Sequence, residues 1–274
     1  MNSDLLLDSI KIVSQTKRNV VEKLDGPTMY SPLSYGIDSV CTGKRVKISI
    51  LDSGCPRHKD IKIDGDKVSF CEENLGVYDQ NGHSTMVSGI INSKNKNSII
   101  GIAPHAELQF AKVINNKGVC SFNALVAGVL WSIVKKIDII VIALGTQYDY
   151  IVLRDAIKKA KQHGICVFAA AGDKNIDEQW EIDFPARYEN SISTGFFTRS
   201  KNKNNIIRKK VDFCLPYKGL YTTYLDNKYI KASGSSMSAA FYAGMAAVLI
   251  EQYKKEGCQD IPSKVYSKLK NIFK

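Results

Sequence analysis

Three residues of types that support nucleophilic catalysis stand where a parallel α/β sheet would place reactive groups. Asp52 follows the apolar run VKISIL, His83 begins a helical pattern in NGHSTMVSGII, and Ser236 lies in a Gly/Ser-rich turn before a long apolar helix. Reactive groups in such sheets collect at the carboxyl ends of the strands. A serine hydroxyl becomes a nucleophile when an imidazole takes its proton and a buried carboxylate orients that imidazole. Each residue alone is more often a turn former or a helix cap, so only the combination indicates this chemistry.

The segments around these residues resemble the three signature blocks of the subtilisin-like serine proteases, the subtilases. The blocks are DSG at Asp52, NGHSTxVSG at His83 and GSSMSAAxxAG at Ser236, in the chain order Asp, His, Ser that subtilisin uses. The separations, 31 and then 153 residues, are close to those of a compact subtilase. The resemblance runs from about residue 30 to about residue 253, which is most of the chain.

This resemblance implies a serine endopeptidase with a peptide or protein substrate. Asp52 would orient His83, which would act as general base and acid for the nucleophile Ser236. Two further segments resemble the edges that pair with an extended substrate: Lys117, Gly118, Val119 and Cys120 on one side, and Ala143, Leu144 and Gly145 on the other. Backbone hydrogen bonds would supply affinity there, and side-chain pockets would supply selectivity.

Two departures from the family pattern concern the rate. Asp173 stands where subtilases usually have Asn, whose amide donates to the oxyanion; an ionised Asp would repel that charge, whereas a protonated Asp could donate. Loss of one such donor costs about 10²–10³ in turnover. Ser84 replaces the Gly that usually follows the catalytic His and would crowd the backbone there. Both residues leave open an alternative function, a weakly active or inactive subtilase fold that binds peptides or regulates a partner.

Asp183 bears on specificity. It precedes the aromatic-Pro step in IDFPAR, where the family often has a small residue at the floor of the primary specificity pocket. A carboxylate there would favour Lys or Arg before the scissile bond through a charge-assisted hydrogen bond. The surrounding stretch is acidic as a whole, so a solvated loop acid is the alternative.

The resemblance implies no cofactor for the chemistry but leaves a structural calcium ion open. Many subtilases hold one ion with an Asp after the first block and a loop after the second helix, and Asp60 and Asn95 stand at the approximate places. Lys94 and Lys96 in the same loop oppose the binding of a hard cation.

Short β-branched runs alternate with helix-length amphipathic stretches along the chain. The expected strands are Val46–Leu51, Leu108–Val113, Ile139–Leu144, Cys166–Ala171 and Ser191–Phe197. The expected helices are Ser84–Asn92, Phe122–Lys136, Ile151–His163 and Met237–Lys255. This alternation predicts an α/β fold with three layers, a doubly wound and mostly parallel sheet with helices on both faces.

The N-terminal region differs from the rest. We expect residues 1–29 to form an extension, with a helix-like stretch ending near Gly26–Pro27, and residues 30–274 to form the peptidase domain. The extension is too short for the folding propeptide of secreted subtilases and resembles the arrangement of intracellular ones. The segment Gly26-Pro27-Thr28-Met29-Tyr30 could block the active site, because a proline near the cleavage position would bind poorly for attack. An inert arm is the alternative.

Composition excludes several classes of protein. The longest apolar runs are of strand length, far below the roughly 20 residues that span a bilayer, so no membrane association is expected. Seven cysteines without a CxxC pair argue against zinc or redox motifs, and the N-terminus does not resemble a signal peptide, so we expect a reduced, cytoplasmic protein.

The net charge of +11 would suit an anionic partner. Six basic and no acidic residues lie between Arg199 and Lys210, a stretch that we expect to be an exposed hairpin or loop. It lacks interleaved aromatic residues that stack on bases, which argues against a nucleic-acid partner.

Overall fold

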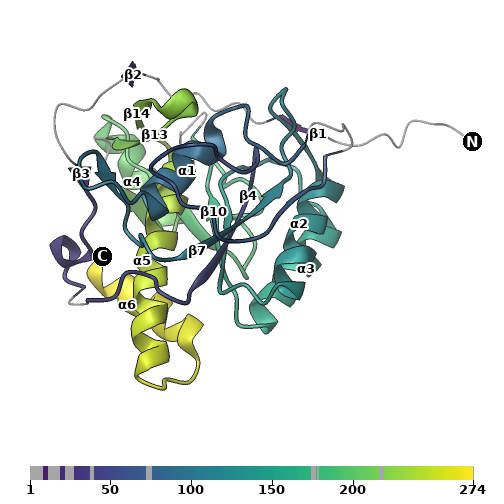
Figure 1. The fold of residues 1–274 in the computed structure, drawn as a ribbon. Helices are drawn as coiled ribbons and strands as arrows, with labels where there is room; N and C mark the ends of the chain where they lie inside the picture. Colours follow the sequence, from purple (N-terminus) through teal and green to yellow (C-terminus); the bar gives the residue numbers. More distant parts are fainter. Residues whose placement is uncertain are drawn as a thin grey trace, which may run out of the picture.

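A parallel sheet of seven strands forms the centre of the protein (Figure 1). The structure is a computed structural model that describes residues 9–11, 19–21, 28–37, 40–71, 76–173, 177, 179–215 and 219–273. The strands lie in the order β12 (Phe213–Leu215), β11 (Ile192–Phe196), β10 (Cys166–Ala170), β9 (Ile139–Ile142), β4 (Lys47–Asp52), β7 (Glu107–Lys112) and β5 (Lys67–Ser69). Because every neighbouring pair is parallel, all the carboxyl ends meet at one edge.

Helices cover both faces of this sheet (Figure 1). One face carries α1 (His83–Asn92), α5 (Ser235–Lys255) and α6 (Ile261–Ile272), and the other carries α2 (Phe122–Val134) and α3 (Ile151–Gln162). Side chains alternate along β4: Ile48 and Ile50 pack into the α5 cluster, whereas Leu51 packs into the α2 and α3 cluster. The predicted three-layer α/β fold is therefore confirmed.

Helix α5 is apolar on nearly all sides because it is enclosed on nearly all sides. It packs against β9, β10, β11, α1 and α6, and most of its residues are buried. Small residues allow this close approach: a Cβ atom on Gly244 would lie 2.9 Å from the Cβ atom of Ile102. The helix therefore holds its first turn, which contains Ser236, in a fixed place at the sheet edge.

Short strands complete the fold around the central sheet. They are β6 (Ile99–Ile100), β8 (Val119–Ser121), β13 (Leu220–Thr223) and β14 (Tyr229–Ala232), with 3-10 turns at Pro32–Tyr35 and Leu225–Asn227. Three N-terminal strands pair with them. β1 (Ser9–Lys11) lies antiparallel to β8, β2 (Asn19–Val21) lies antiparallel to β14, and β3 (Thr28–Met29) lies parallel to β6.

One expectation for the N-terminal region is wrong where the structure describes it. Asn19–Val21 is a strand and not part of a helix, because β14 offers it main-chain partners. Thr28–Met29 pairs with β6, so these two residues of the segment proposed to block the site do not pair with the expected substrate-binding segments. Gly26 and Pro27 lie outside the described residues.

The basic stretch after Arg199 is also different from the expectation. It forms helix α4 (Lys201–Lys210) rather than a hairpin or loop. The hydroxyl of Ser200 caps the helix by accepting from the N–H of Lys203, and Ile207 is buried against Val211 and Trp180. A cap and one apolar anchor are thus enough to order a mainly polar segment.

The predicted central strands and helices are confirmed to within two residues at each end. No helix in the described part of the chain is long and apolar enough to cross a membrane.

Candidate active site

Asp52 and His83 form a buried pair at the carboxyl edge of the sheet. Asp52 ends the central strand β4 and His83 begins α1, and their side chains are 0% and 3% exposed. Nδ1 of His83 lies 2.9 Å from Oδ1 and 2.8 Å from Oδ2 of Asp52. The N–H of Ser53 donates to the same carboxylate at 2.6 Å. This arrangement fixes the ring orientation and leaves Nε2 for proton transfer.

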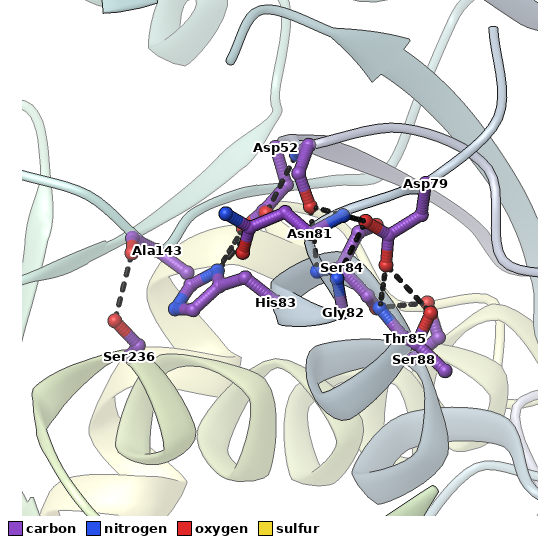
Figure 2. A network of polar contacts seen from close by, with 11 residues as sticks. Asp52, Asp79, Asn81, Gly82, His83, Ser84, Thr85, Ser88, Ala143 and Ser236 are labelled. Carbon is purple, nitrogen blue, oxygen red and sulfur yellow. Dashed lines mark hydrogen bonds and ion pairs between the residues drawn. The ribbon is translucent and has the colours of Figure 1, made fainter. Parts of the chain in front are cut away.

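Ser236 lies on the other side of the imidazole, in the first turn of α5 (Figure 2). Its hydroxyl donates to the carbonyl oxygen of Ala143 at 2.7 Å. Ala143 directly follows β9, the strand next to β4, so neighbouring strand ends bring the carboxylate of Asp52 close to the carbonyl that accepts from Ser236. The hydroxyl must turn away from Ala143 to bond to His83.

Asp173 lies against the start of α5, where it bonds to Ser235, the residue before Ser236. The N–H of Ser235 donates to its two carboxyl oxygens at 3.0 and 2.9 Å, and the Ser235 hydroxyl donates to Oδ2 at 2.9 Å. The residue as a whole is exposed, but its carboxyl group is enclosed against this turn. Burial raises the pKa of Asp173, and the hydrogen bonds from Ser235 oppose that rise.

Both expected substrate-binding segments lie beside the triad residues. On one side, Gly118 forms a turn with a φ of +79° and leads into β8, which contains Val119 and Cys120. The side chain of Asn115 holds that turn by accepting from the N–H groups of Lys117 and Val119, both at 3.0 Å. On the other side, Ala143, Leu144 and Gly145 continue from β9. The strand β1 pairs with β8 along its edge.

Asp183 packs against the second of these segments. A Cβ atom on Gly145 would lie 2.6 Å from the Cβ atom of Asp183, and a Cβ atom on Gly172 would lie 2.4 Å from its Oδ2. Only glycine fits at either position, so the carboxylate lies between the chain after β9 and the chain after β10. The N–H of Asp183 donates to Ala171 at 3.0 Å, and the amide of Gln147 donates to Oδ1.

Comparison with known proteins agrees with this geometry. The profile of the subtilase family matches residues 43–269. The chain belongs to the subtilase family. Subtilisin DY of Bacillus licheniformis is 31% identical over 235 residues, which are 84% of this chain and 85% of that protein.

Two relatives are named as intracellular enzymes. The major intracellular serine protease of Bacillus subtilis (strain 168) is 33% identical over 230 residues, covering 79% of this chain and 72% of that protein. The intracellular serine protease of Paenibacillus polymyxa is 34% identical over 219 residues, covering 76% and 67%. The subtilase described here is a subtilisin-like serine endopeptidase.

The expected calcium residues of this subtilase do come together, but as a hydrogen-bonded cluster. Asp60 accepts from the amide of Asn95 at 2.8 Å and from the hydroxyls of Ser98 and Tyr229 at 2.5 and 2.6 Å. Burial works to raise the pKa of Asp60, but these hydrogen bonds outweigh it and lower the pKa. Because three donors point at the carboxylate, this arrangement does not fit a cation.

No metal site is evident elsewhere either, among the residues that the structure describes. They contain no group of three or more His, Cys, Asp or Glu side chains that could hold an ion.

Sequence reasoning missed the polar residues that support the subtilase triad. Asp79 and Ser53 bond to one another and to the start of α1, and the ammonium of Lys112 donates to the carbonyl oxygen of Ser53 at 2.6 Å. A signal was present for Lys112, a lysine within an apolar strand that is 0% exposed here. For Asp79 the signal was a carboxylate three residues before the Gly82 that starts the helix.

Proposed function

We propose that Asp52, His83 and Ser236 hydrolyse peptide bonds through an acyl-enzyme. The observation that carries this proposal is the buried contact of His83 with both oxygens of Asp52, beside the nucleophile at the start of α5. Nε2 of His83 takes the hydroxyl proton as Oγ of Ser236 attacks the substrate carbonyl carbon. The imidazolium, stabilised by Asp52, then gives this proton to the leaving amine. Water repeats the sequence on the ester and releases the acid.

Charge on the developing oxyanion would be stabilised by the first turn of α5. The N–H of Ser236 and the positive end of the helix dipole lie at this position. Asp173 supplies a carboxyl group where a family member usually supplies an amide, so we infer a restrained turnover near neutral pH. A fold that binds peptides without cleaving them is the competing function, which Asp173 and Ser84 favour.

Labelling by a fluorophosphonate separates the two functions. This probe forms a covalent bond only with an activated serine. We expect labelling of the wild-type chain that is lost in Ser236→Ala and in His83→Ala. Peptide binding without labelling would show that the site is not catalytic.

Asp183 supports a preference for Lys or Arg before the scissile bond. Its carboxylate lies between Gly145, in the expected substrate-binding segment, and Gly172, next to Asp173. A basic side chain reaching this place would form a charge-assisted hydrogen bond. A peptide library should show a basic preference that Asp183→Ala removes. Apolar preference in both proteins would refute this assignment.

The N-terminal segment is a further partner of the proposed site. β1 adds to the edge of β8 with Ile10 opposite Cys120 and Lys11 opposite Val119, as an extended substrate would. β2 pairs with β14, the strand that leads into the nucleophile turn. We infer that this segment competes with substrate.

Deletion of residues 1–25 should lower the apparent KM if the segment competes. The corresponding synthetic peptide, added back, should inhibit the shortened chain. Unchanged kinetics after deletion would mean that the segment is an inert arm.

A cytoplasmic location is supported by the two relatives named as intracellular enzymes. The buried Cys55, Cys120 and Cys166 are thiols and not disulfides, which suits a reducing compartment. Fractionation of cells that express the protein from its own gene would test this location.

A further inference from the structure

Asp79 accepts more hydrogen bonds than its position in a loop before α1 requires. Its Oδ1 accepts from the hydroxyl of Ser53 and from the N–H groups of Asn81 and Gly82, each at 2.9 Å. Its Oδ2 accepts from the N–H of Thr85 at 2.9 Å and from the Thr85 hydroxyl at 2.6 Å. The residue is 6% exposed, and Figure 2 shows this network directly beside the Asp52–His83 pair.

The first turn of α1 depends on these acceptors. The first N–H groups of a helix have no partner within the helix, and a side chain at the N-cap usually accepts one of them. Here the N-cap is Gly82, which has no side chain and a φ of +89°. Instead, the N–H of Thr85 donates to Asp79 and the N–H of Ser84 donates to the Ser53 hydroxyl at 3.0 Å. Together with the N–H of Gly82, which donates to Asp79, these bonds hold the residues on both sides of His83 from outside the helix.

Ser53 connects this helix start to the catalytic carboxylate. Its N–H donates to Oδ1 of Asp52, and its hydroxyl donates to Asp79 while accepting from Ser84. One residue thus bonds to the group that orients the imidazole and to the helix that carries the imidazole.

The backbone around this link is fixed. The N–H of Cys55 donates to the carbonyl of Val77 at 2.8 Å, and the N–H of Asp79 donates to the carbonyl of Cys55 at 2.8 Å. A Cβ atom on Gly54 would lie 2.7 Å from the Val77 oxygen, so the two segments approach closely. The buried ammonium of Lys112 joins them by donating to the carbonyl of Ser53 at 2.6 Å.

We propose that Asp79 is a positioning residue that fixes His83 relative to Asp52. This inference rests on the proposed triad. Asp79 acts through Gly82, Thr85 and Ser53 and does not touch the reacting atoms. Its loss frees the first turn of α1 to shift, and a misplacement of about 1 Å in a catalytic group can cost about 10² in rate. Binding is unaffected, because the substrate-binding segments lie on β8 and after β9.

The test compares Asp79→Asn with Asp212→Asn in the full chain, using kcat, KM and thermal unfolding. Asp212 is a matched control: it accepts three hydrogen bonds, from Ser193 and Tyr266, at the opposite, amino ends of the strands. In Asp79→Asn one oxygen becomes an amide donor that faces other donors. We expect kcat to fall roughly ten-fold or more at unchanged KM. Asp212→Asn should lower only the Tm.

Thr85 supplies a smaller perturbation in case Asp79→Asn does not fold. Thr85→Val removes one hydroxyl donor and should lower kcat. Thr85→Ser keeps that donor and should leave kcat near the wild-type value. The double variant with Ser53→Ala and Asp79→Asn should lower kcat by less than the product of the fold-losses in the two single variants, because both residues act through the same hydrogen bond.

The outcomes separate this inference from the proposed function. If the wild-type chain is not labelled at Ser236 by a fluorophosphonate, the triad itself is wrong. If the wild-type chain is labelled, and Asp79→Asn and Thr85→Val lower the Tm with kcat unchanged, Asp79 has only a structural role and the inference is overturned.

Discussion

Replacement of Asp173 by Asn tests how this subtilase stabilises the charge that develops on the substrate. The present carboxyl group accepts from the N–H and the hydroxyl of Ser235. An Asn side chain keeps one oxygen for Ser235 and presents an N–H donor with its other arm. The change therefore adds a donor and removes a negative charge at nearly constant volume.

The expected effect of Asp173→Asn is a rise in kcat of about 10²-fold at pH 8, since a single oxyanion donor contributes about 10²–10³. KM should not change, because the oxyanion exists only in the transition state and in the intermediate. The positive end of the α5 dipole and the N–H of Ser236 act equally in both proteins, so they cancel in the comparison.

The advantage of Asn should decrease as the pH falls. Burial raises the pKa of Asp173, and a protonated carboxyl group can donate as an amide does. The ratio of the two kcat values at each pH removes the pH effects that both proteins share. The free energy of unfolding should also depend on the protonation of Asp173. A raised folded-state pKa means that stability present below pH 3.8 is lost as the pH rises, so Asp173→Asn should be the more stable protein at pH 8.

The assay is hydrolysis of a peptide amide from pH 5 to pH 9, with Asp212→Asn as the control for a distant carboxylate-to-amide change. Equal kcat values for wild-type and Asp173→Asn across this range would refute the reasoning. A lower kcat in the variant would show instead that the carboxylate is needed to shape the start of α5.

Three further variants test buried polar groups. The Ser84 hydroxyl is buried without a hydrogen-bond partner among the described residues, so Ser84→Ala should raise the free energy of unfolding by about 1 kcal/mol in urea denaturation. Burial lowers the pKa of His58 from 6.5, so stability present above that pH is lost as the pH falls; wild-type should lose more unfolding free energy from pH 7.5 to pH 5 than His58→Gln. Millimolar calcium should shift the Tm of wild-type and Asp60→Ala equally, since Asp60 already accepts three donors; a larger shift in wild-type would indicate an ion at Asp60.

The sequence predicted the central strands and the helices on both faces because these depend on local apolar patterns. An apolar run such as Ile139–Ile142 is buried on both faces when it lies inside a covered parallel sheet. The residues that follow such runs meet at one edge of the sheet. The same logic brought Asp52 and Ala143 to the site. The triad order and spacing then identified the family.

What the sequence did not show are contacts between residues far apart in the chain. Tyr229 bonds to Asp60 across 169 positions, and nothing local indicates that a tyrosine hydroxyl would fill the place considered for an ion. Likewise, Asp79 could be recognised as a loop acid, but its bond to Ser53 arises only when β4 and α1 meet. The prediction of a loop or hairpin at Lys201–Lys210 was wrong for another reason. Burial of Ile207 stabilises helix α4 there although its composition is polar.

Two features are proposed to restrain this site, and their chemistry separates them. β1 bonds to the main chain of β8 and would compete with substrate for that edge, so its effect should appear in KM and vanish at saturation. Asp173 bonds to Ser235 and, in the proposed mechanism, would oppose charge in the transition state, so its effect should appear in kcat. Because the two share no hydrogen-bond partner among the described residues, deletion of residues 1–25 and Asp173→Asn should combine multiplicatively in kcat/KM. A gain in kcat from the deletion alone would mean that the N-terminal segment also displaces the catalytic groups, and competition would not be its whole effect.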